Sequence, residues 1–393
     1  MKMPIVVIGC LAAGALALLA ACQPADTVSE TASCTECHSR DTTVGGAVLT
    51  AQTQYDNSGH LNGPRVLNPT PGDIYEFEGS NSYGGGAGAS CNKCHTHQGF
   101  LDFITAGMPS SYTGKTYFVP TPPECFTCHK PHIAGDFTPR KTSSETLADG
   151  TTVYDGGAGN LCATCHKSRR TASSFLTGFP KTWGSSDGPH HGPQADFLMG
   201  VNQHDYGKPY AGQSVHLDPR DPNSCVDCHM YTPTDRLRNL QLGGHGMYLS
   251  AEVSAALTDV VGVCASCHTG FGTSLTGDFE SVAAINTRLD DIRANRDLLI
   301  GYFGNGTTNF SGNGTGPIES LTGNDVASGE WNKDWVFASA TLSQTQSYAF
   351  WNFKLFIEDR SQGIHNPYFA HQILYDAVEA LGMTPVGTPP NRP

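Results

Sequence analysis

The stretch CNKCHTHQGF, residues 91–100, places two cysteines and a histidine within five positions, with a second histidine two residues further on. The same C-x-x-C-H frame occurs six times in the chain of 393 residues. The copies are CTECH (34–38), CNKCH (91–95), CFTCH (125–129), CATCH (162–166), CVDCH (225–229) and CASCH (264–268). Because these pairs contain all but two of the 14 cysteines, one chemistry has to explain all six.

Three chemistries use a C-x-x-C pair: disulfide exchange, zinc ribbons and covalent attachment of haem. A redox pair is expected beside a βαβ pattern, and a zinc ribbon requires no histidine directly after the second cysteine. Here a histidine follows every pair, although the chain has only 16 histidines. C-x-x-C-H is the signature of c-type haem attachment, in which the adjacent imidazole reaches the iron. The motif therefore predicts haem, with the thiols forming thioethers to the vinyl groups.

The sequence thus predicts six covalently bound haem c groups. The attachment residues are Cys34, Cys37, Cys91, Cys94, Cys125, Cys128, Cys162, Cys165, Cys225, Cys228, Cys264 and Cys267. The predicted proximal iron ligands are His38, His95, His129, His166, His229 and His268.

The second axial ligand decides what each iron can do. A second strong ligand leaves no coordination position for a substrate, so the iron can only transfer electrons. Ten histidines lie outside the motifs, whereas the methionines are too few to serve every haem. We therefore predict bis-histidine ligation throughout. The predicted distal ligands are His60, His132, His191, His216, His245 and His365, with His97 and His190 as reserves and His204 and His371 not chosen. The sequence leaves the pairing of distal histidines with haems open.

Composition indicates how such a chain would fold. It contains 45 glycines and 24 prolines, and charged residues make 15%, against about 25% in average proteins. A chain with so many turn formers builds a large side-chain core poorly. We predict a multihaem cytochrome c fold: mostly irregular coil with short helices wrapped around stacked haems, and a C-terminal α-helical segment. The net charge of −13 argues against nucleic-acid binding.

The N-terminus has the pattern of an export signal. Lys2 precedes an apolar run that is too short for a convincing membrane span. The segment ends Leu19-Ala20-Ala21-Cys22, which resembles the bacterial lipoprotein cleavage box; a plain secretory signal is the alternative. Lipidation at Cys22 would anchor the chain on a membrane. Gln23 follows the cysteine, which in lipoproteins resembles export to the outer membrane.

The predicted organisation is a signal peptide (1–21), a tether (22–33), a six-haem region (34–277) and a C-terminal helical region (278–393). Apolar spacing predicts a helix capped by Asp278 and reaching Phe303. A Gly/Asn/Ser/Thr-rich loop is expected over about 304–330, and its Asn-X-Ser/Thr triplets are interpreted as loop composition. Further helices are predicted over 342–362 and 367–381, the last starting after His365 and stopping at Gly382.

The six motifs and the export signal resemble bacterial multihaem c-type cytochromes, especially the outer-membrane and extracellular cytochromes of metal-reducing bacteria. The segment AFWNFKLFIEDRSQGIHNP, residues 349–367, resembles the C-terminal unit of the nitrite reductase and hydroxylamine oxidoreductase superfamily, with His365 as a distal ligand. The catalytic haem of the nitrite and tetrathionate reductases in that superfamily has a C-x-x-C-K motif, and no motif here ends in lysine. This departure from the superfamily gives no support for a substrate-binding iron, so the sequence predicts an electron carrier, with oxidoreductase activity left open.

The favoured interpretation is an exported electron-transfer protein that passes electrons from periplasmic donors towards outer-membrane or extracellular acceptors. Its expected partners are other redox proteins, with extracellular metal acceptors as a further option, and its expected location is the outer membrane or outside the cell. Two alternatives stay open: a reductase of a small nitrogen or sulfur oxyanion with one five-coordinate iron, and a subunit of a polymeric cytochrome filament.

Overall fold

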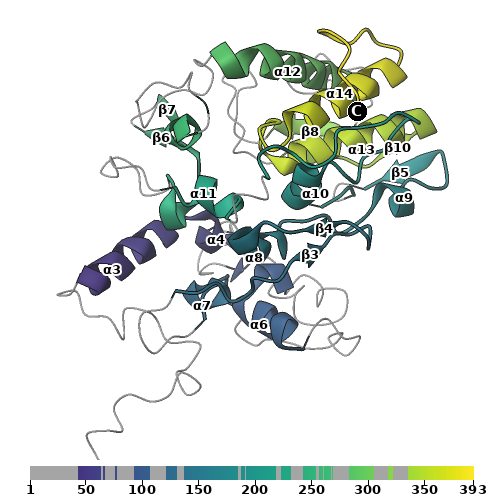
Figure 1. The fold of residues 1–393 in the computed structure, drawn as a ribbon. Helices are drawn as coiled ribbons and strands as arrows, with labels where there is room; N and C mark the ends of the chain where they lie inside the picture. Colours follow the sequence, from purple (N-terminus) through teal and green to yellow (C-terminus); the bar gives the residue numbers. More distant parts are fainter. Residues whose placement is uncertain are drawn as a thin grey trace, which may run out of the picture. The chain divides into compact units, whose positions relative to one another are not determined.

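The structure is a computed structural model of the whole chain. It describes residues 43–62, 65–66, 76–77, 93–106, 121–130, 137–184, 187–190, 192–217, 223–231, 242–253, 256–259, 261–266, 268, 283–304, 317–321 and 335–393. The chain forms two compact units, Met1–Lys141 and Thr142–Pro393, whose elements are labelled in Figure 1. The predicted division near residue 277 is a boundary by function and falls inside the second unit.

The first unit consists of short helices, one of which starts directly after the second motif. The hydroxyl of Thr96 accepts a hydrogen bond from the backbone N–H of Gly99 at 2.9 Å, which caps that helix. The third motif forms a single turn, closed by the Thr127 hydroxyl, which accepts from the N–H of Glu124 at 2.7 Å. The elements are α3 (Thr43–Tyr55), α4 (Gly59–Asn62), α6 (His97–Ala106), α7 (Cys125–Cys128) and the antiparallel pair β1 (Arg65–Val66) and β2 (Glu76–Phe77).

The second unit begins with a hairpin and a series of single-turn helices that carry the fourth to sixth motifs. The hairpin turn forms because the carboxylate of Asp149 accepts from the backbone N–H groups of Thr151 and Thr152, while Gly150 adopts a positive φ of 75°. The elements are β3 (Glu145–Thr146), β4 (Val153–Tyr154), η5 (Gly157–Gly159), α8 (Asn160–Ala163), α9 (Ala172–Phe175), β5 (Lys181–Trp183), α10 (Gln194–Met199), α11 (Cys225–His229), η7 (Gly244–Gly246), β6 (Ser250–Val253), β7 (Ala256–Asp259) and η8 (Val261–Ser266).

Three longer helices follow: α12 (Ala283–Phe303), α13 (Gln344–Asp359) and α14 (Pro367–Ala380). Helices were predicted at all three places, and the structure confirms them there; the expected cap Asp278 lies outside the described residues. Short strands precede α13, namely β8 (Ile318–Leu321), β9 (Trp335–Phe337) and β10 (Ala340–Leu342), which pairs with β5.

The ends of α13 and α14 show why these helices stop where they do. α13 ends at Asp359, three residues before its predicted end, because Arg360 (φ 61°) and Gln362 (φ 55°) adopt left-handed backbone conformations. α14 starts as predicted, with Asn366 as N-cap and Pro367 in the first turn. At its C-terminus Gly382 has a φ of 77°, and the bonds Gly382 N–H to Glu379 O and Met383 N–H to Val378 O complete a Schellman motif.

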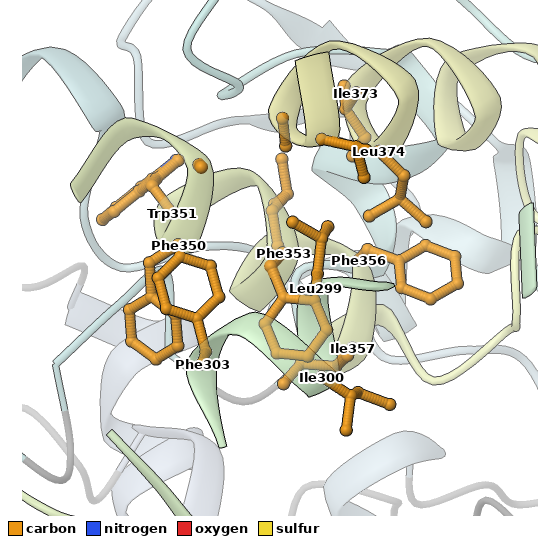
Figure 2. Close-up of a cluster of buried hydrophobic side chains, with 14 of the residues drawn as sticks. Leu299, Ile300, Phe303, Phe350, Trp351, Phe353, Phe356, Ile357, Ile373 and Leu374 are labelled. Carbon is orange, nitrogen blue, oxygen red and sulfur yellow. The ribbon is translucent and has the colours of Figure 1, made fainter. Parts of the chain in front are cut away.

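The main hydrophobic core lies among these three helices. Figure 2 shows side chains of α12, α13 and α14 gathered in one cluster, with the rings of Phe303, Phe350 and Phe353 close together. The ring centroids of Phe303 and Phe350 are 4.9 Å apart. Trp183 of β5 joins the same core and donates from its indole N–H to Ser347 Oγ at 3.1 Å.

The C-terminal segment after α14 is bound to this core by polar contacts. The side-chain amide of Asn295 pairs with both backbone groups of Val386, at 2.9 and 3.0 Å. Arg392 donates to both carboxylate oxygens of the buried Asp376 at 2.7 Å, which also accepts from Lys208 at 2.7 Å. This network holds the last residues of the chain on α12 and α14.

Among the residues that the structure describes, none of the helices combines the length and the apolar character needed to cross a membrane. The proposed signal and Cys22 lie outside those residues.

Candidate functional site

The structure describes the third, fourth and fifth motifs completely and the second and sixth in part. Cys34, Cys37, His38, Cys91, Cys267, His132 and His191 lie outside the described residues. The described motif cysteines are Cys94, Cys125, Cys128, Cys162, Cys165, Cys225, Cys228 and Cys264. The proximal candidates His95, His129, His166, His229 and His268 and the distal candidates His60, His216, His245 and His365 are all described.

Two of the predicted proximal histidines each face a predicted distal histidine. His229, the last residue of α11, faces His365, which precedes α14; their ring centroids are 6.1 Å apart with an interplanar angle of 55°. His268, which ends the sixth motif, faces His216 at 6.3 Å and 66°. Each pair therefore joins a motif histidine to a histidine from a distant part of the sequence.

The spacing of these rings is what an iron between them would require. A metal–imidazole bond is about 2 Å long, and the ring centre lies about 1 Å behind the nitrogen, so two trans ligands have ring centres about 6 Å apart. Both observed pairs have this separation, which is too long for stacking or direct hydrogen bonding. The donor set of the two pairs thus fits six-coordinate haem iron.

Backbone carbonyls orient several of these rings. Nδ1 of His229 donates to Met247 O at 2.9 Å, and Nδ1 of His216 donates to Ile364 O at 2.6 Å. In the first unit, Nδ1 of His129 donates to Phe137 O at 2.9 Å. A carbonyl can only accept, so Nδ1 carries the proton and Nε2 keeps the lone pair. This is the arrangement that metal-binding histidines adopt.

The pKa values of two of the paired rings, His216 and His229, are lowered, which favours neutral imidazole. Burial, opposed by the carbonyl of Ile364, lowers the pKa of His216. Burial and the nearby His365 lower the pKa of His229. Because imidazole must lose its proton to bind a metal, a lowered pKa favours the ligating form.

His365 is held by a carboxylate instead of a carbonyl. Its Nδ1 donates to Asp359 Oδ1 at 2.7 Å, and Asp359 also accepts from the hydroxyl of Ser361. Burial alone would lower the pKa of His365, but the charge of Asp359 and this hydrogen bond outweigh it and raise the pKa. The result is a carboxylate–histidine pair of the kind that supports metal ligands.

His166 of the fourth motif is tied to the same end of α13. The side-chain amide of Gln194 donates from Nε2 to the carbonyl of Asp359 at 3.0 Å. Its Oε1 therefore faces His166 Nδ1 at 3.0 Å and accepts from it. Residue 359 thus positions two candidate ligands, His365 through its carboxylate and His166 through Gln194.

The fourth and fifth motifs pack directly against each other. A hydrogen bond with Cys162 of the fourth motif lowers the pKa of Cys225 in the fifth motif well below its usual value. A Cβ at Gly159, next to the fourth motif, would lie 2.6 Å from Ser224 Oγ and 3.2 Å from Cys225 Sγ. Only glycine permits this approach, so the sequence places two attachment sites side by side.

The histidines differ in exposure. The side chains of His166, His216 and His268 are exposed, as expected of rings that would face a large bound group. By contrast, His97 is 1% exposed and its Nδ1 lies 2.7 Å from Thr127 Oγ1, and His371 is 5% exposed within α14. These two rings pack inside the protein.

The remaining histidines have individual surroundings. His204 stacks on Tyr348 of α13 with ring centroids 3.6 Å apart, and His190 Nε2 lies 3.3 Å from the guanidinium of Arg169. His60 lies in α4 and His245 in η7. The predicted roles of His60 and His245, and of His97 and His190 as reserves, stay predictions.

Apolar side chains beside candidate ligands support the fit of a large apolar group. Val215, next to His216, is 71% exposed, and Phe137, whose carbonyl holds His129, is 46% exposed. A macrocycle bound at either histidine would cover such a side chain and remove apolar surface from water.

Sequence reasoning did not identify Asp359, Gln194 or the contact between Cys162 and Cys225. Asp359 and His365 are six residues apart, and three residues between them have a positive φ, which no periodicity predicts. Gln194 and His166 are 28 residues apart and meet because α10 starts beside the fourth motif, where the backbone N–H of Ala195 donates to the carbonyl of His166 at 3.0 Å.

No protein-family model matches the chain, and searches of characterised proteins and of solved structures find no similar protein.

Proposed function

We propose that the protein is a multihaem c-type cytochrome that carries six bis-histidine haems and transfers electrons. The observation that carries the proposal is the pair of facing imidazoles, His229 with His365 and His216 with His268, at 6.1 and 6.3 Å. Each pair contains one motif histidine and one histidine chosen independently from the sequence. Haem iron, when bound, supplies the one-electron redox change.

The residues of the chain have three tasks in this proposal. The cysteines hold each macrocycle covalently, and the two imidazoles close the iron to substrates, which leaves outer-sphere electron transfer. The hydrogen bonds on Nδ1 fix each ring so that little reorganisation accompanies oxidation or reduction. The protein therefore acts by spacing the haems and by adjusting their potentials.

The packing of the motifs supports a haem order in the second unit. Because Gly159, beside the fourth motif, approaches Cys225 of the fifth and Cys162 lies next to Cys225, haems attached at these two motifs would lie close together. The fifth and sixth sites share a short segment, because Ile364 holds His216 while the next residue, His365, faces His229. We infer that electrons pass between these haems in the order four, five, six.

Location and partners form part of the same proposal. Lipidation at Cys22 after export would hold the protein on the outer membrane, and its donors and acceptors would be other redox proteins, including periplasmic and outer-membrane cytochromes. Mass spectrometry of the purified protein tests both points, because six haems and an acylated N-terminus each add a defined mass.

Single substitutions test the ligand assignment. His365→Ala and His216→Ala should each convert one haem from low spin to high spin in electron paramagnetic resonance (EPR) spectra and allow it to bind carbon monoxide. His204→Ala is the matched control, because this ring stacks on Tyr348, and it should leave every haem low spin. Colourless protein, zinc bound by the cysteine pairs, or a wild-type haem that binds carbon monoxide would contradict the proposal.

A further inference from the structure

Asp359 differs from the other groups that hold candidate ligands. Among the described Nδ1 contacts, carbonyl oxygens hold His129, His216 and His229, and an amide oxygen holds His166. His365 alone in this set meets a carboxylate, at 2.7 Å. One candidate haem therefore has a negatively charged group bonded to its distal ligand.

The carboxylate is fixed in place. Asp359 is 1% exposed, and its second oxygen accepts from the hydroxyl and the N–H of Ser361. It is the last residue of α13, and the C-terminal end of a helix carries partial negative charge. The dipole and the carboxylate thus act on His365 in the same direction, in a site where water cannot screen them.

We propose that Asp359 sets the reduction potential of the fifth haem, lowering it below the potentials of the fourth and sixth. This inference rests on the proposed function. A carboxylate on Nδ1 raises the basicity of the imidazole, which stabilises ferric over ferrous iron. At the neighbouring sites, the described Nδ1 acceptors of His166 and His216 are neutral oxygens.

The position of the fifth haem gives this potential a consequence. The site lies between the other two, through Cys162 and Cys225 on one side and the peptide Ile364–His365 on the other. A low potential at the middle site makes it the last of the three haems to be reduced. Electron transfer from the fourth haem to the sixth would then pass through a site of lower potential, and Asp359 would determine how much lower that potential is.

The test is a potentiometric titration of the intact haem-loaded protein with Asp359→Asn, followed in the visible spectrum at pH 8. Asparagine keeps the shape and an acceptor oxygen but removes the charge. We expect one of the six components to become at least about tenfold easier to reduce, which is about 59 mV for one electron. The EPR signal of that same haem should shift while remaining low spin, which a merely structural role would not produce.

Asp196→Asn is the matched control, because Asp196 is also 1% exposed but its carboxylate accepts from the N–H of Ser168 at 2.7 Å. It removes an equally buried charge without touching His365. An equal shift in both variants, no shift in Asp359→Asn, or loss of its low-spin signal would overturn the inference. None of these results would contradict the proposed function. The proposed function would be contradicted if the wild-type protein lacked six low-spin haems.

Discussion

Two helices of the second unit end in residues of the candidate sites, yet they are stabilised in opposite ways. α13 has 16 residues, of which 12 are buried, and it packs against α14 and β10. α11 has five residues, CVDCH, and none of them is buried. The buried side chains of α13 stabilise it, whereas α11 contributes no buried side chain that could do so.

The same contrast separates the segments that surround these helices. The cluster centred on α12, α13 and α14 contains most of the fully buried large side chains, including Trp351 and Phe353. Among the residues described, the buried clusters near the fifth motif are small: Cys225 packs against a cluster of six buried residues, and Leu242 is the single buried member of another. The comparison indicates that one region folds by ordinary side-chain packing, and we propose that the other folds around the bound haems.

The largest expected effect comes from removing one attachment site. Cys225→Ala with Cys228→Ala should delete one haem and unfold the segments around α11, since folding and binding of the group are one equilibrium there. Hydrogen exchange should show lost protection over residues 223–231 and 242–253, with α13 and α14 unaffected. If α11 kept its protection, the contrast between the two regions would be wrong.

The next effect tests the side-chain core. Phe353 is fully buried, so Phe353→Ala should reduce the free energy of unfolding by about 3–5 kcal/mol. Denaturant unfolding of the haem-loaded protein measures this. Tyr368→Ala is the control, because this side chain is 43% exposed and should change stability by at most about 0.5 kcal/mol. A small effect of Phe353→Ala would mean that the C-terminal helices, too, depend on haem.

A polar network of the same region should contribute less. Asp376 is fully buried between Lys208 and Arg392, whose side chains are 34% and 22% exposed. Asp376→Ala strands two cations, but because both reach solvent we expect a loss of about 2 kcal/mol, below the range for fully buried pairs. A double-mutant cycle with Arg392→Ala should give a coupling energy above 0.5 kcal/mol; additive losses would contradict the network.

The two regions also differ in how far the sequence predicted them. The helices near 283, 344 and 367 were predicted because their apolar spacing and caps are local signals; for α14 both Asn366 and Gly382 act as expected. The motif histidines could be named from local sequence as well. The pairing of His229 with His365 could not, because 136 residues of chain separate them and only tertiary packing joins them.

The stability of the protein should depend on pH through a buried carboxyl group in α10. Burial raises the pKa of Asp196 in α10 to about 6, above its usual value of about 3.9. A raised pKa means that the folded protein binds the proton more tightly, so this stability is present below about pH 4 and is lost as the pH rises towards 6. Asp196→Asn should therefore raise the free energy of unfolding at pH 7 by about 1–2 kcal/mol relative to wild type, with no gain at pH 4. Thermal unfolding at both pH values measures the difference, and an equal change at both would contradict the assignment.

The smallest expected effect comes from removing the N-cap of a helix, compared between the long helix α13 and the single-turn helix α9. Ser343 caps α13 by accepting from Gln346 N–H while its own N–H donates to Gln346 Oε1 at 2.9 Å, and Thr171 caps α9 with Ser174 in the same way. Ser343→Ala should cost about 1 kcal/mol, a usual value for losing an N-cap. α13 belongs to the cooperative core, so the loss should appear in global unfolding. α9 is a single turn of four residues, so Thr171→Ala should raise local hydrogen exchange in α9 while global stability falls by less than half as much. Ala172 of α9 lies in the main hydrophobic cluster, so equal global losses would show that α9 unfolds together with the rest of that core.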